Sequence, residues 1–596
     1  MTYGISKLSG PIYRIEGGGN IGGKARGLVF ASDICNRHIR QDPIFEGLTR
    51  GGMIRIRFPK CFVMTTGFFN EFVRKTGLER RALECKNDAD VMRAFLERKG
   101  ELDEAFVMAL SDVSEFFARN GIPMSARSSG KEDLFDHSFS GVYKTVFVRN
   151  NGSKEQNLND LKDAVLIVWA SNFCMNARAY RSKAGIIDKE GMAVILTEAI
   201  GRDYGGLFYP FFSGVALSRN GYPEKGIPRE NGRICRNDGV CRLAIGLGPG
   251  AVENESVFMF APAKPKVSYH GEGWTESQKY FYAIDLLGRF PEFRDSETGL
   301  VRLPIQHFLD YETALERETG TMSKRLLHAL TSAKWNQDTG QMEEMCGLPY
   351  QPVGYSMQYN FKSLLSTLDS AVPQLIHYLS GWLDRSFLCG SDTEFAGELN
   401  PDGNMDLVVL QTRPHSVSEA RIVLPEVNAG NVLLEIREHD DELKIRGRSN
   451  VTKLTDVLFV KNSVGSDDFS ASSSFIARAI GRFNEQFANS GRRYALVVPG
   501  RIGSKESSLG IPCELSDIGR SSVIIEIGGG EFSEGAHFAT DLEQLGIVSA
   551  LLGDAEAAKK LLDRGTIVDE NKHFIHLRYD GVSYACNGKK LMVFDD

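Results

Sequence analysis

Two runs of sequence decide the fold: DTEFAGEL at 392–399 and MDLVVLQTR at 405–413. The residues between them begin with NPDG at 400–403, a composition in which asparagine, proline, aspartate and glycine each favour a turn. Each flanking run has the length of a typical strand. We therefore predict a β-hairpin that brings the two runs side by side.

Two acids, an amide and a guanidinium belong to this hairpin. Asp392 and Glu394 stand two positions apart, so in a strand both carboxylates project from the same face. Gln411 and Arg413 have the same spacing on the returning strand. Mg²⁺ favours one or two carboxylates together with phosphate oxygens, so the four side chains suit a Mg²⁺–phosphate clamp. A solvated strand face with cross-strand charge pairs would show the same pattern.

A glycine-rich loop lies near the start of the chain, GGGNIGGKARG at 17–27, and a helical pattern follows it. Closely spaced glycines let backbone N–H groups approach an anion, and the helix offers its N-terminus to the same anion. Lys24 at the end of the loop is placed to reach a phosphate as a point charge. The pattern is neither a Walker A sequence nor GxGxxG in a βαβ unit, and a flexible turn with a surface lysine is the alternative.

A second polar motif, SARSSGKED at 125–133, is followed by SFSG at 138–141. Arg127 carries a permanent guanidinium charge that suits the oxygens of a triphosphate. Ser128 is the first of two adjacent hydroxyl residues at a predicted strand end that is rich in donors. A hairpin turn decorated with ion pairs is the alternative. The loop AIGLGPG at 244–250 is a weaker glycine signal of the same kind.

The composition of the chain is that of an ordinary soluble globular protein, with 596 residues, 42% hydrophobic and 25% charged. The net charge of −7 gives no global attraction to nucleic acid or to anionic membrane, and we expect neither as a partner. The ten cysteines include no CxxC pair and no zinc-ligand spacing. The N-terminus lacks a signal-peptide pattern, and no stretch approaches the ~20 apolar residues of a membrane helix. We expect a cytoplasmic protein with reduced thiols.

The apolar patterning predicts an α+β chain in two parts. We place the domain boundary near residue 425, between a larger domain at 1–425 and a smaller α/β domain at 426–596. The larger domain is predicted to contain a mostly helical insertion at about 275–390. Its shorter segments are predicted as strands at 62–73, at 192–200 and, next to the latter, at 213–220, with helices over 78–120 and 157–185.

Together these segments resemble the ATP-binding N-terminal domain of phosphoenolpyruvate (PEP) synthase and pyruvate phosphate dikinase, which is often called the PEP/pyruvate-binding domain. The resemblance spans residues ~10–415 in the family's order, and several of its motifs are long, which makes it specific. The segments that carry it are GGKARGL, FPKCFVMTTGFFNEFV, SARSSGKEDLFDHSFSGVYKTV, VWASNFCMNARAYRSKAGI, MAVILTEAI with SGVALSRN, and DTEF with LQTRP.

The resemblance implies an ATP-grasp fold that binds Mg·ATP, and it implies roles for individual side chains. Lys24 and Arg127 would hold the β- and γ-phosphates, and Arg413 would support the transferring group. Glu198, with the backbone after it, resembles the edge that contacts adenine. Mg²⁺ and phosphate would be held by Asp392, Glu394 and Gln411, and the loops 138–141 and 246–250, with Gly141 and Gly248, would close over the phosphates.

The chain also departs from the family's full-length enzymes, which relay phosphate through a histidine in a TSHAA-type signature. This sequence has no Ser-His dipeptide, and the ~170 residues after the predicted boundary are too few for a (β/α)₈ barrel of typically ~250. We therefore do not expect PEP synthesis by this chain alone. The C-terminal run VPGRIGS at 498–504 resembles the tail of two-domain bacterial proteins, with Ile502 where those tails carry tryptophan.

His537 is the histidine that best suits a chemical role, because it follows a Ser-Glu-Gly-Ala run in this tail and is a possible phosphoryl acceptor. A structural histidine is the alternative. The sequence thus predicts an ATP-dependent phosphotransferase that passes a phosphoryl group to a histidine or to a separate acceptor, either on a partner protein or on a small molecule. The rival hypothesis is a catalytically silent ATP-binding module with a regulatory or scaffold role.

Overall fold

The structure is a computed structural model with mixed helices and strands, as expected for an α+β chain. No helix in the described part of the chain is both long and apolar enough to cross a bilayer. The structure describes residues 4–49, 51–130, 142–184, 191–220, 234–252, 258–265, 278–305, 307–308, 330–336, 341–346, 356–359, 371–400, 404–415, 422–437, 445–461, 467–490, 492–504, 510–528, 542, 546–553 and 555–596.

The chain divides into two compact units, and each is described by itself. The larger unit comprises Met1–Cys174, Lys189–Gly221 and Lys225–Ser416. The smaller unit comprises Met175–Asp188, Tyr222–Glu224 and Val417–Asp596, so it takes one segment from the middle of the N-terminal sequence.

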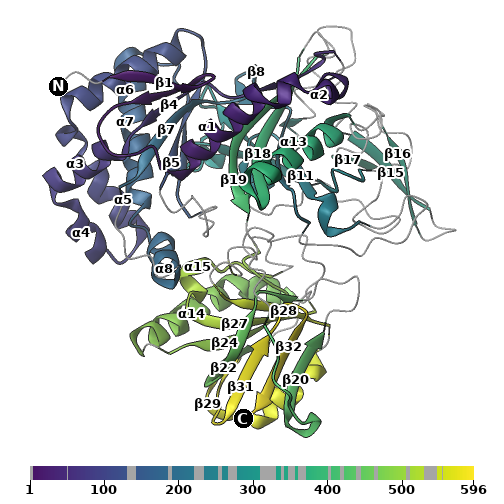
Figure 1. Ribbon diagram of the computed structural model, residues 1–596. Helices are drawn as coiled ribbons and strands as arrows, with labels where there is room; N and C mark the ends of the chain where they lie inside the picture. The colour runs from purple at the N-terminus through teal and green to yellow at the C-terminus, as the bar shows by residue number, and fades with distance from the viewer. Residues whose placement is uncertain are drawn as a thin grey trace. The chain divides into compact units, whose positions relative to one another are not determined.

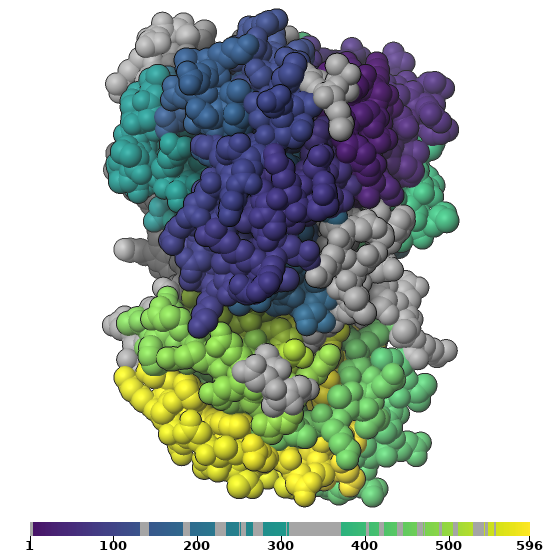
Figure 2. All heavy atoms as spheres, turned by 90° about the vertical axis from the view of Figure 1, so that its left-hand side faces the viewer, coloured from purple at the N-terminus to yellow at the C-terminus, as the bar shows by residue number. Residues whose placement is uncertain are grey.

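The first sheet of the larger unit has six strands in the order β1-β2-β4-β7-β5-β6. Helices cover one of its faces (Figure 1), and residues of this N-terminal part of the chain form much of the surface in Figure 2. In this layer Trp169 packs against Phe69, Phe72 and Phe106 at ring-centroid distances of 5.1–5.8 Å. The strands are β1 Ile5–Ser9, β2 Ile12–Ile15, β4 Cys61–Met64, β5 Met124–Ser129, β6 Thr145–Val148 and β7 Ala193–Glu198, and the helices α3 Thr66–Thr76, α4 Leu78–Glu84, α5 Asp88–Leu96, α6 Glu104–Ala118 and α7 Lys154–Ser171.

The second sheet of this unit has the order β12-β11-β10-β18-β19-β3 and contains the hairpin predicted from the sequence. Its strands are β3 Ile54–Arg57, β10 Phe212–Leu217, β11 Val240–Ile245, β12 Phe258–Phe260, β18 Gly390–Leu399 and β19 Met405–His415. Two smaller sheets hold β8 Arg202–Tyr204, β9 Leu207–Tyr209, β13 Tyr280–Asp285 and β14 Val301–Pro304, and β15 Leu330–Asn336, β16 Gln341–Cys346 and β17 Ser356–Tyr359. The remaining α-helices among the described residues of this unit are α1 Gly22–Arg37, α2 Pro43–Leu48, α9 Pro249–Val252 and α13 Ala371–Phe387.

Helix α1 joins the two large sheets through one apolar core. Its residues Ala25 and Leu28 are buried in the same cluster as Ile195 of the first sheet and Leu407 of the second. Gly27 faces β19 so closely that a β-carbon there would lie 2.0 Å from the carbonyl oxygen of Thr412. The apolar face of α1 therefore fixes where its N-terminal turn stands relative to both sheets.

Two sequence predictions are corrected by this fold. The strand predicted at 62–73 ends at Met64, and α3 follows, because Phe68, Phe69, Phe72 and Val73 have the helical spacing that buries one face. The segment predicted at 213–220 to lie beside 192–200 is β10, which pairs with β11 and β18 in the other sheet.

The insertion predicted as mostly helical at about 275–390 is described only in part. Its described residues include the strands β13 to β17 and the helix α13. The strand β13 pairs with β9 and β14.

The smaller unit is an α/β structure around a seven-stranded sheet, β21-β28-β27-β24-β23-β30-β29, with a four-stranded sheet, β20-β32-β31-β22. The strands β23, β24, β27 and β28 run parallel. The strands are β20 Val432–Arg437, β21 Ile445–Arg446, β22 Ser449–Lys453, β23 Asp456–Val460, β24 Tyr494–Pro499, β25 Arg501–Ile502, β26 Gly510–Ile511, β27 Ser521–Ile527, β28 Val548–Leu552, β29 Thr566–Glu570, β30 Phe574–Arg578, β31 Val582–Cys586 and β32 Lys590–Asp595, and the helices α8 Met175–Ala184, α14 Asp467–Ser490, α15 Leu515–Ile518 and α17 Lys559–Arg564.

Helix α8 belongs to this smaller unit and packs against α15. The side chain of Asn176 accepts a hydrogen bond from the backbone N–H of Ser516 at 2.9 Å and donates one to Glu514 at 2.5 Å. A helix encoded near residue 180 is therefore part of a body whose sheet is encoded after residue 416.

A fully buried carboxylate, Asp456, ties β23 to its neighbours in the smaller unit. It lies 2.9 Å from the Nε2 atom of His576, accepts a hydrogen bond from Thr455 at 2.8 Å and forms a 3.3 Å ion pair with Arg492. Burial alone would raise the pKa of Asp456, but the bonds from His576 and Thr455 and the charge of Arg492 hold that pKa below its ordinary value.

We predict that Asp456→Asn destabilises the smaller unit by about 3–5 kcal/mol at neutral pH, because it removes one partner from a buried charge network. Since the folded-state pKa of Asp456 is lowered, its stabilising contribution is complete above the ordinary aspartate pKa of about 3.9 and is lost as the pH falls through the lower folded value. Denaturant unfolding between pH 7 and pH 2 should show this loss in the wild type and a weaker one in the variant. The exposed Asp569→Asn is the matched control, and equal stability of both variants would contradict the prediction.

Candidate functional site

The N-terminal turn of α1 is fixed against the end of β5 by backbone contacts. The N–H of Gly23 donates to the carbonyl of Gly130 at 2.6 Å, and the N–H of Ala25 donates to the hydroxyl of Ser129 at 3.1 Å. That hydroxyl in turn donates to the carbonyl of Ile21 at 2.8 Å. The glycine-rich loop and the serine motif, which are a hundred residues apart in the sequence, therefore form one structure.

Gly22 is the residue that permits this approach. Its φ of +71° lies in the left-handed region, and a β-carbon on it would stand 2.0 Å from the carbonyl oxygen of Ser129. No side chain fits there without moving β5 or α1, so this position requires glycine for steric reasons.

Lys24 extends from the first turn of α1 toward β5. Its ammonium group donates to the hydroxyl of Ser128 at 3.2 Å and lies 5.6 Å from the centre of the Tyr143 ring. The two residues predicted from separate motifs to contact phosphate are thus in direct contact with each other. Tyr143 was not singled out by the sequence motifs, because an aromatic residue beside a cation leaves no spacing signature.

Arg127 connects β5 to the hairpin of the second sheet. Its Nη2 atom donates to Glu394 at 2.6 Å and to the amide oxygen of Gln411 at 3.2 Å, and its Nη1 atom donates to the carbonyl of Leu410 at 3.3 Å. The side chains of Arg127 and Glu394 are only 16% and 17% exposed, so the pair is partly desolvated and stronger than a surface ion pair.

The hairpin register places the acids opposite the residues expected to act with them. Asp392 is directly across from Arg413, and Glu394 is directly across from Gln411, with a β-bulge immediately after Glu394. Arg413 donates from Nε and Nη2 to the same oxygen of Asp392, at 2.9 and 2.6 Å. Two arginine–carboxylate pairs therefore involve this hairpin, and both acids reside on one strand face.

The donor set fits a hard divalent cation that is shared with phosphate. Asp392, Glu394 and Gln411 offer two carboxylates and one amide oxygen, which are oxygen ligands of the kind Mg²⁺ accepts. Within the described residues, no group of three or more His, Cys, Asp or Glu side chains could hold a metal ion by itself.

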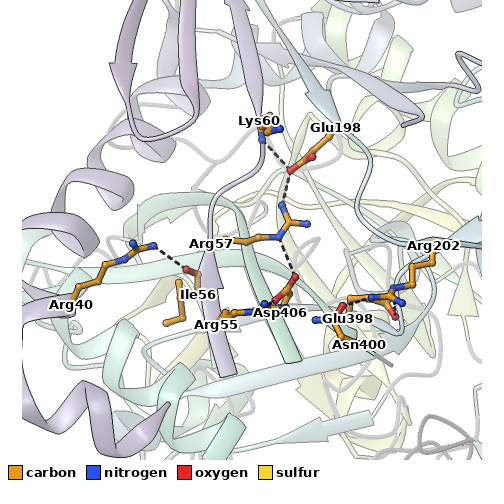
Figure 3. Close-up of polar contacts among 10 residues, drawn as sticks. All are labelled: Arg40, Arg55, Ile56, Arg57, Lys60, Glu198, Arg202, Glu398, Asn400 and Asp406. Carbon is orange, nitrogen blue, oxygen red and sulfur yellow. Dashed lines mark hydrogen bonds and ion pairs between the residues drawn. The ribbon is translucent and has the colours of Figure 1, made fainter. Parts of the chain in front are cut away.

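Glu198 belongs to a different group of contacts (Figure 3). Its carboxylate accepts from Arg57 at 2.6 Å and from the backbone N–H of Lys60 at 3.1 Å, and Arg57 also lies 3.6 Å from Asp406. Arg57 ends β3 in the second sheet and Glu198 ends β7 in the first, so this ion pair connects the two sheets. The Glu198 carboxylate therefore already has an ion-pair partner in Arg57.

The buried Cys61 lies within electrostatic reach of both groups of contacts. Desolvation, with the negative charge of Glu198, raises the pKa of its thiol to about 12, while the positive charge of Arg127 opposes the rise. A thiol with this pKa stays protonated at neutral pH, so Cys61 is not activated as a thiolate nucleophile.

The glycine loop after β11 lies toward the opposite end of the second sheet from Asp392. Ile245 is aligned with Phe212 and then with Gly397, whereas Asp392 is aligned with Leu217. An added β-carbon at Gly248 would meet nothing within 4 Å. The two remaining predicted site residues, Gly141 and His537, are outside the described residues.

One buried charge near the hairpin was missed by the sequence motifs. Arg242, which is 3% exposed, is aligned with Val215 and through it with Glu394, so all three lie on the same sheet face. The available signal was a single arginine inside the apolar run VCRLAI at 240–245, because a charged residue in a buried strand needs a polar partner or a ligand.

A lysine at a glycine-held helix N-terminus contacts the end of β5, and an arginine of the same strand contacts the hairpin that carries the paired carboxylates. Such groups are typical of nucleotide-binding domains. A family model described as "Pyruvate phosphate dikinase, AMP/ATP-binding domain" matches residues 19–428, more than half of the chain. The chain belongs to this family, and ATP is the ligand that membership supports. No curated protein matches the chain.

We predict that Gly22→Ala lowers stability by at least about 2 kcal/mol, since it combines a left-handed backbone with overlap against Ser129. It should also weaken ATP binding, because α1 and β5 must separate to accommodate the methyl group. Gly47→Ala is the matched control: Gly47 lies in α2 with open space around it, and alanine there should be neutral or stabilising by up to ~1 kcal/mol. Thermal unfolding and ATP titration measure both effects. Wild-type stability and wild-type ATP affinity in the Gly22→Ala variant would contradict the steric role inferred for Gly22.

Proposed function

We propose that this chain binds Mg·ATP between α1, the end of β5 and the β18–β19 hairpin, and transfers a phosphoryl group from it. The observation that carries the proposal is the chain of contacts from Lys24 through Ser128 and the adjacent Arg127 to Glu394 and Gln411. These residues come from three separate segments: Lys24 of α1 contacts β5 through Ser128, and Arg127 of the same strand contacts the hairpin.

The proposed chemistry is electrostatic, because phosphoryl transfer requires alignment and charge neutralisation and little covalent work by the protein. Lys24 would contact the terminal phosphates as a point charge, and Arg127 would present its planar fork to their oxygens. The N–H groups at the start of α1 would add a fixed positive dipole beside them. Arg413, held by Asp392, would face the group in transfer.

Asp392, Glu394 and Gln411 would hold Mg²⁺, which supplies charge neutralisation between phosphate oxygens when bound. The side chains that would share this task are already ordered by their arginine partners. Ordering before binding reduces the conformational entropy lost on binding, since neither carboxylate must be immobilised from free solution.

The acceptor in this proposal is a histidine or a separate group, either on a partner protein or on a small molecule. His537 is the candidate histidine within the chain. The proposal does not include PEP synthesis, and it requires no nucleic acid.

A second candidate function is an ATP-binding regulatory or scaffold module without turnover. One observation favours it: both acids of the hairpin are already paired with arginine, at 2.6 Å in each case. An ion pair of this kind competes with Mg²⁺ for the carboxylate and with phosphate for the guanidinium. Binding of ATP without any product would be the behaviour of such a module.

We predict that Arg127→Ala and Glu394→Gln each reduce ATP consumption by about 10²–10³-fold, the loss typical when one electrostatic contact to the reacting group is removed. The matched control is Arg119→Ala on the exposed end of α6, whose ion pair with Glu115 lies at the surface. Circular dichroism confirms that each variant is folded. Unchanged turnover in either site variant would reject the assignment.

We further predict that incubation with Mg·ATP adds one phosphate to the intact chain, and that mild acid removes it, as expected for a phosphohistidine. Intact-mass analysis before and after acid measures this directly. His537→Ala should abolish the gain if that histidine is the acceptor. ATP binding without a mass gain, and without release of AMP, ADP or phosphate, would favour the silent module.

A further inference from the structure

A cavity of about 330 Å³ lies at the outer edge of the first sheet, among residues that the nucleotide site does not use. Its walls come from the edge strand β6, the turn at 149–152, helix α7 and the turn at 294–299. All of these segments belong to the larger unit. The volume is within the ~300–1,000 Å³ range of small-molecule sites.

The turn at 149–152 is held in a conformation that gives the cavity a fixed wall. Asn150 has a φ of +54°, in the left-handed region that few residues other than glycine adopt. Its buried amide is anchored to α6, where it accepts from the hydroxyl of Ser114 at 2.9 Å and donates to the carbonyl of the same residue at 3.1 Å. The flanking residues Arg149 and Asn151 both line the cavity.

The opposite wall is fixed to β6 by backbone contacts. The N–H of Phe147 donates to the carbonyl of Thr298 at 2.8 Å, and a β-carbon on Gly299 would lie 2.4 Å from the carbonyl oxygen of Phe147. Asp295 closes this turn through the N–H groups of Glu297 and Gly299. The positions of Arg149 and Arg294 are therefore set by two independently braced turns, as in a preformed site.

Two cations and two anions face this cavity. Arg149 and Arg294 are within electrostatic reach of Asp160, yet no ion pair within 4.0 Å joins Asp160 to either of them in the described structure. Asp163, in contrast, forms an ion pair with Lys99, with 2.8 Å between the Lys99 Nζ atom and Oδ1 of Asp163. The arrangement thus leaves two guanidinium groups and one carboxylate around a common space without direct contact between the opposite charges.

The pKa of Asp160 reflects the lack of a cation in direct contact with its carboxylate. Desolvation, with the negative charge of Asp163, raises the pKa of its carboxyl, even though Arg294, Arg149 and Lys99 all lower it. Asp160 and Arg294 are both exposed residues, so a ligand can reach them from solvent. A positive group placed directly beside Asp160 would stabilise the charged form of its carboxylate.

We propose that this cavity binds a small amino acid, with its carboxylate on Arg149 and Arg294 and its ammonium group on Asp160. A zwitterion matches the paired charges, whereas a plain dianion would be repelled by Asp160 and Asp163, and a plain diamine would be repelled by the two arginines. Arginine suits the carboxylate because its fork donates two parallel hydrogen bonds.

The proposed amino acid site is separate from the candidate ATP site, although one pair of strands carries both. β6 pairs with β5, and Arg127 on β5 is aligned with Thr145, the residue before the cavity's first strand residue, Val146. The proposal does not depend on phosphoryl transfer, because the cavity residues have no part in the contacts of Lys24, Arg127 or the hairpin.

The test measures binding of three five-carbon probes to the full chain by calorimetry: L-glutamate, glutarate, which lacks the ammonium group, and 1,5-diaminopentane, which lacks carboxylates. We expect L-glutamate to bind most tightly. Arg149→Gln and Arg294→Gln should each weaken that binding by at least about tenfold, the loss expected when a charge-assisted hydrogen bond is removed. Arg80→Gln on the exposed face of α4 is the matched control and should have no effect.

Asp160→Asn separates the zwitterion proposal from simple anion binding. It should weaken binding of L-glutamate, which loses its ammonium partner, and strengthen binding of glutarate, which loses a repulsive neighbour. Circular dichroism and ATP binding verify that the variants remain folded. The proposal is overturned by absence of saturable L-glutamate binding at millimolar concentration, by equal affinity for glutarate, or by arginine variants that bind like the wild type.

Discussion

The contact between the first turn of α1 and the end of β5 is the constraint on which the rest of the larger unit depends. It requires a left-handed backbone at Gly22 and is secured by the hydroxyl of Ser129, which bonds to both sides of the turn. Because α1 is also buried against both large sheets, this one approach determines where the helix N-terminus and Lys24 stand. The positions of Arg127 and of the hairpin follow from the same packing.

The charged side chains near this contact form ion pairs, and different ion pairs connect different parts of the larger unit. Arg127 with Glu394 and Arg413 with Asp392 hold the side chains of the candidate site. Arg57 with Glu198 connects the ends of two strands from different sheets (Figure 3). A partly buried ion pair contributes little net stability when intact but is costly to break, so each pair specifies a geometry more than it strengthens the fold.

The hairpin and the helix α1 were predictable from sequence, because turn residues, glycine spacing and apolar periodicity are local signals. Contacts between predicted residues, such as Lys24 with Ser128, were expected only through a resemblance to a family whose motifs occur in the same order. The strand β13 was missed although its run YFYAID at 280–285 is rich in aromatic residues that favour strands. Arg242 and the ion pair of Glu198 were missed because both depend on which strands become neighbours.

Because it contains helix α8, the smaller unit depends on sequence from both halves of the chain. The ten residues of this helix lie in the sequence of the N-terminal half, yet Asn176 completes hydrogen bonds at the start of α15 in the smaller unit. No single cut of the polypeptide can release the smaller unit intact, because the C-terminal fragment would lack α8 and the N-terminal fragment would keep it without its packing partner. During synthesis on the ribosome, α8 is translated more than three hundred residues before α15. It therefore cannot form these contacts until α15 has emerged.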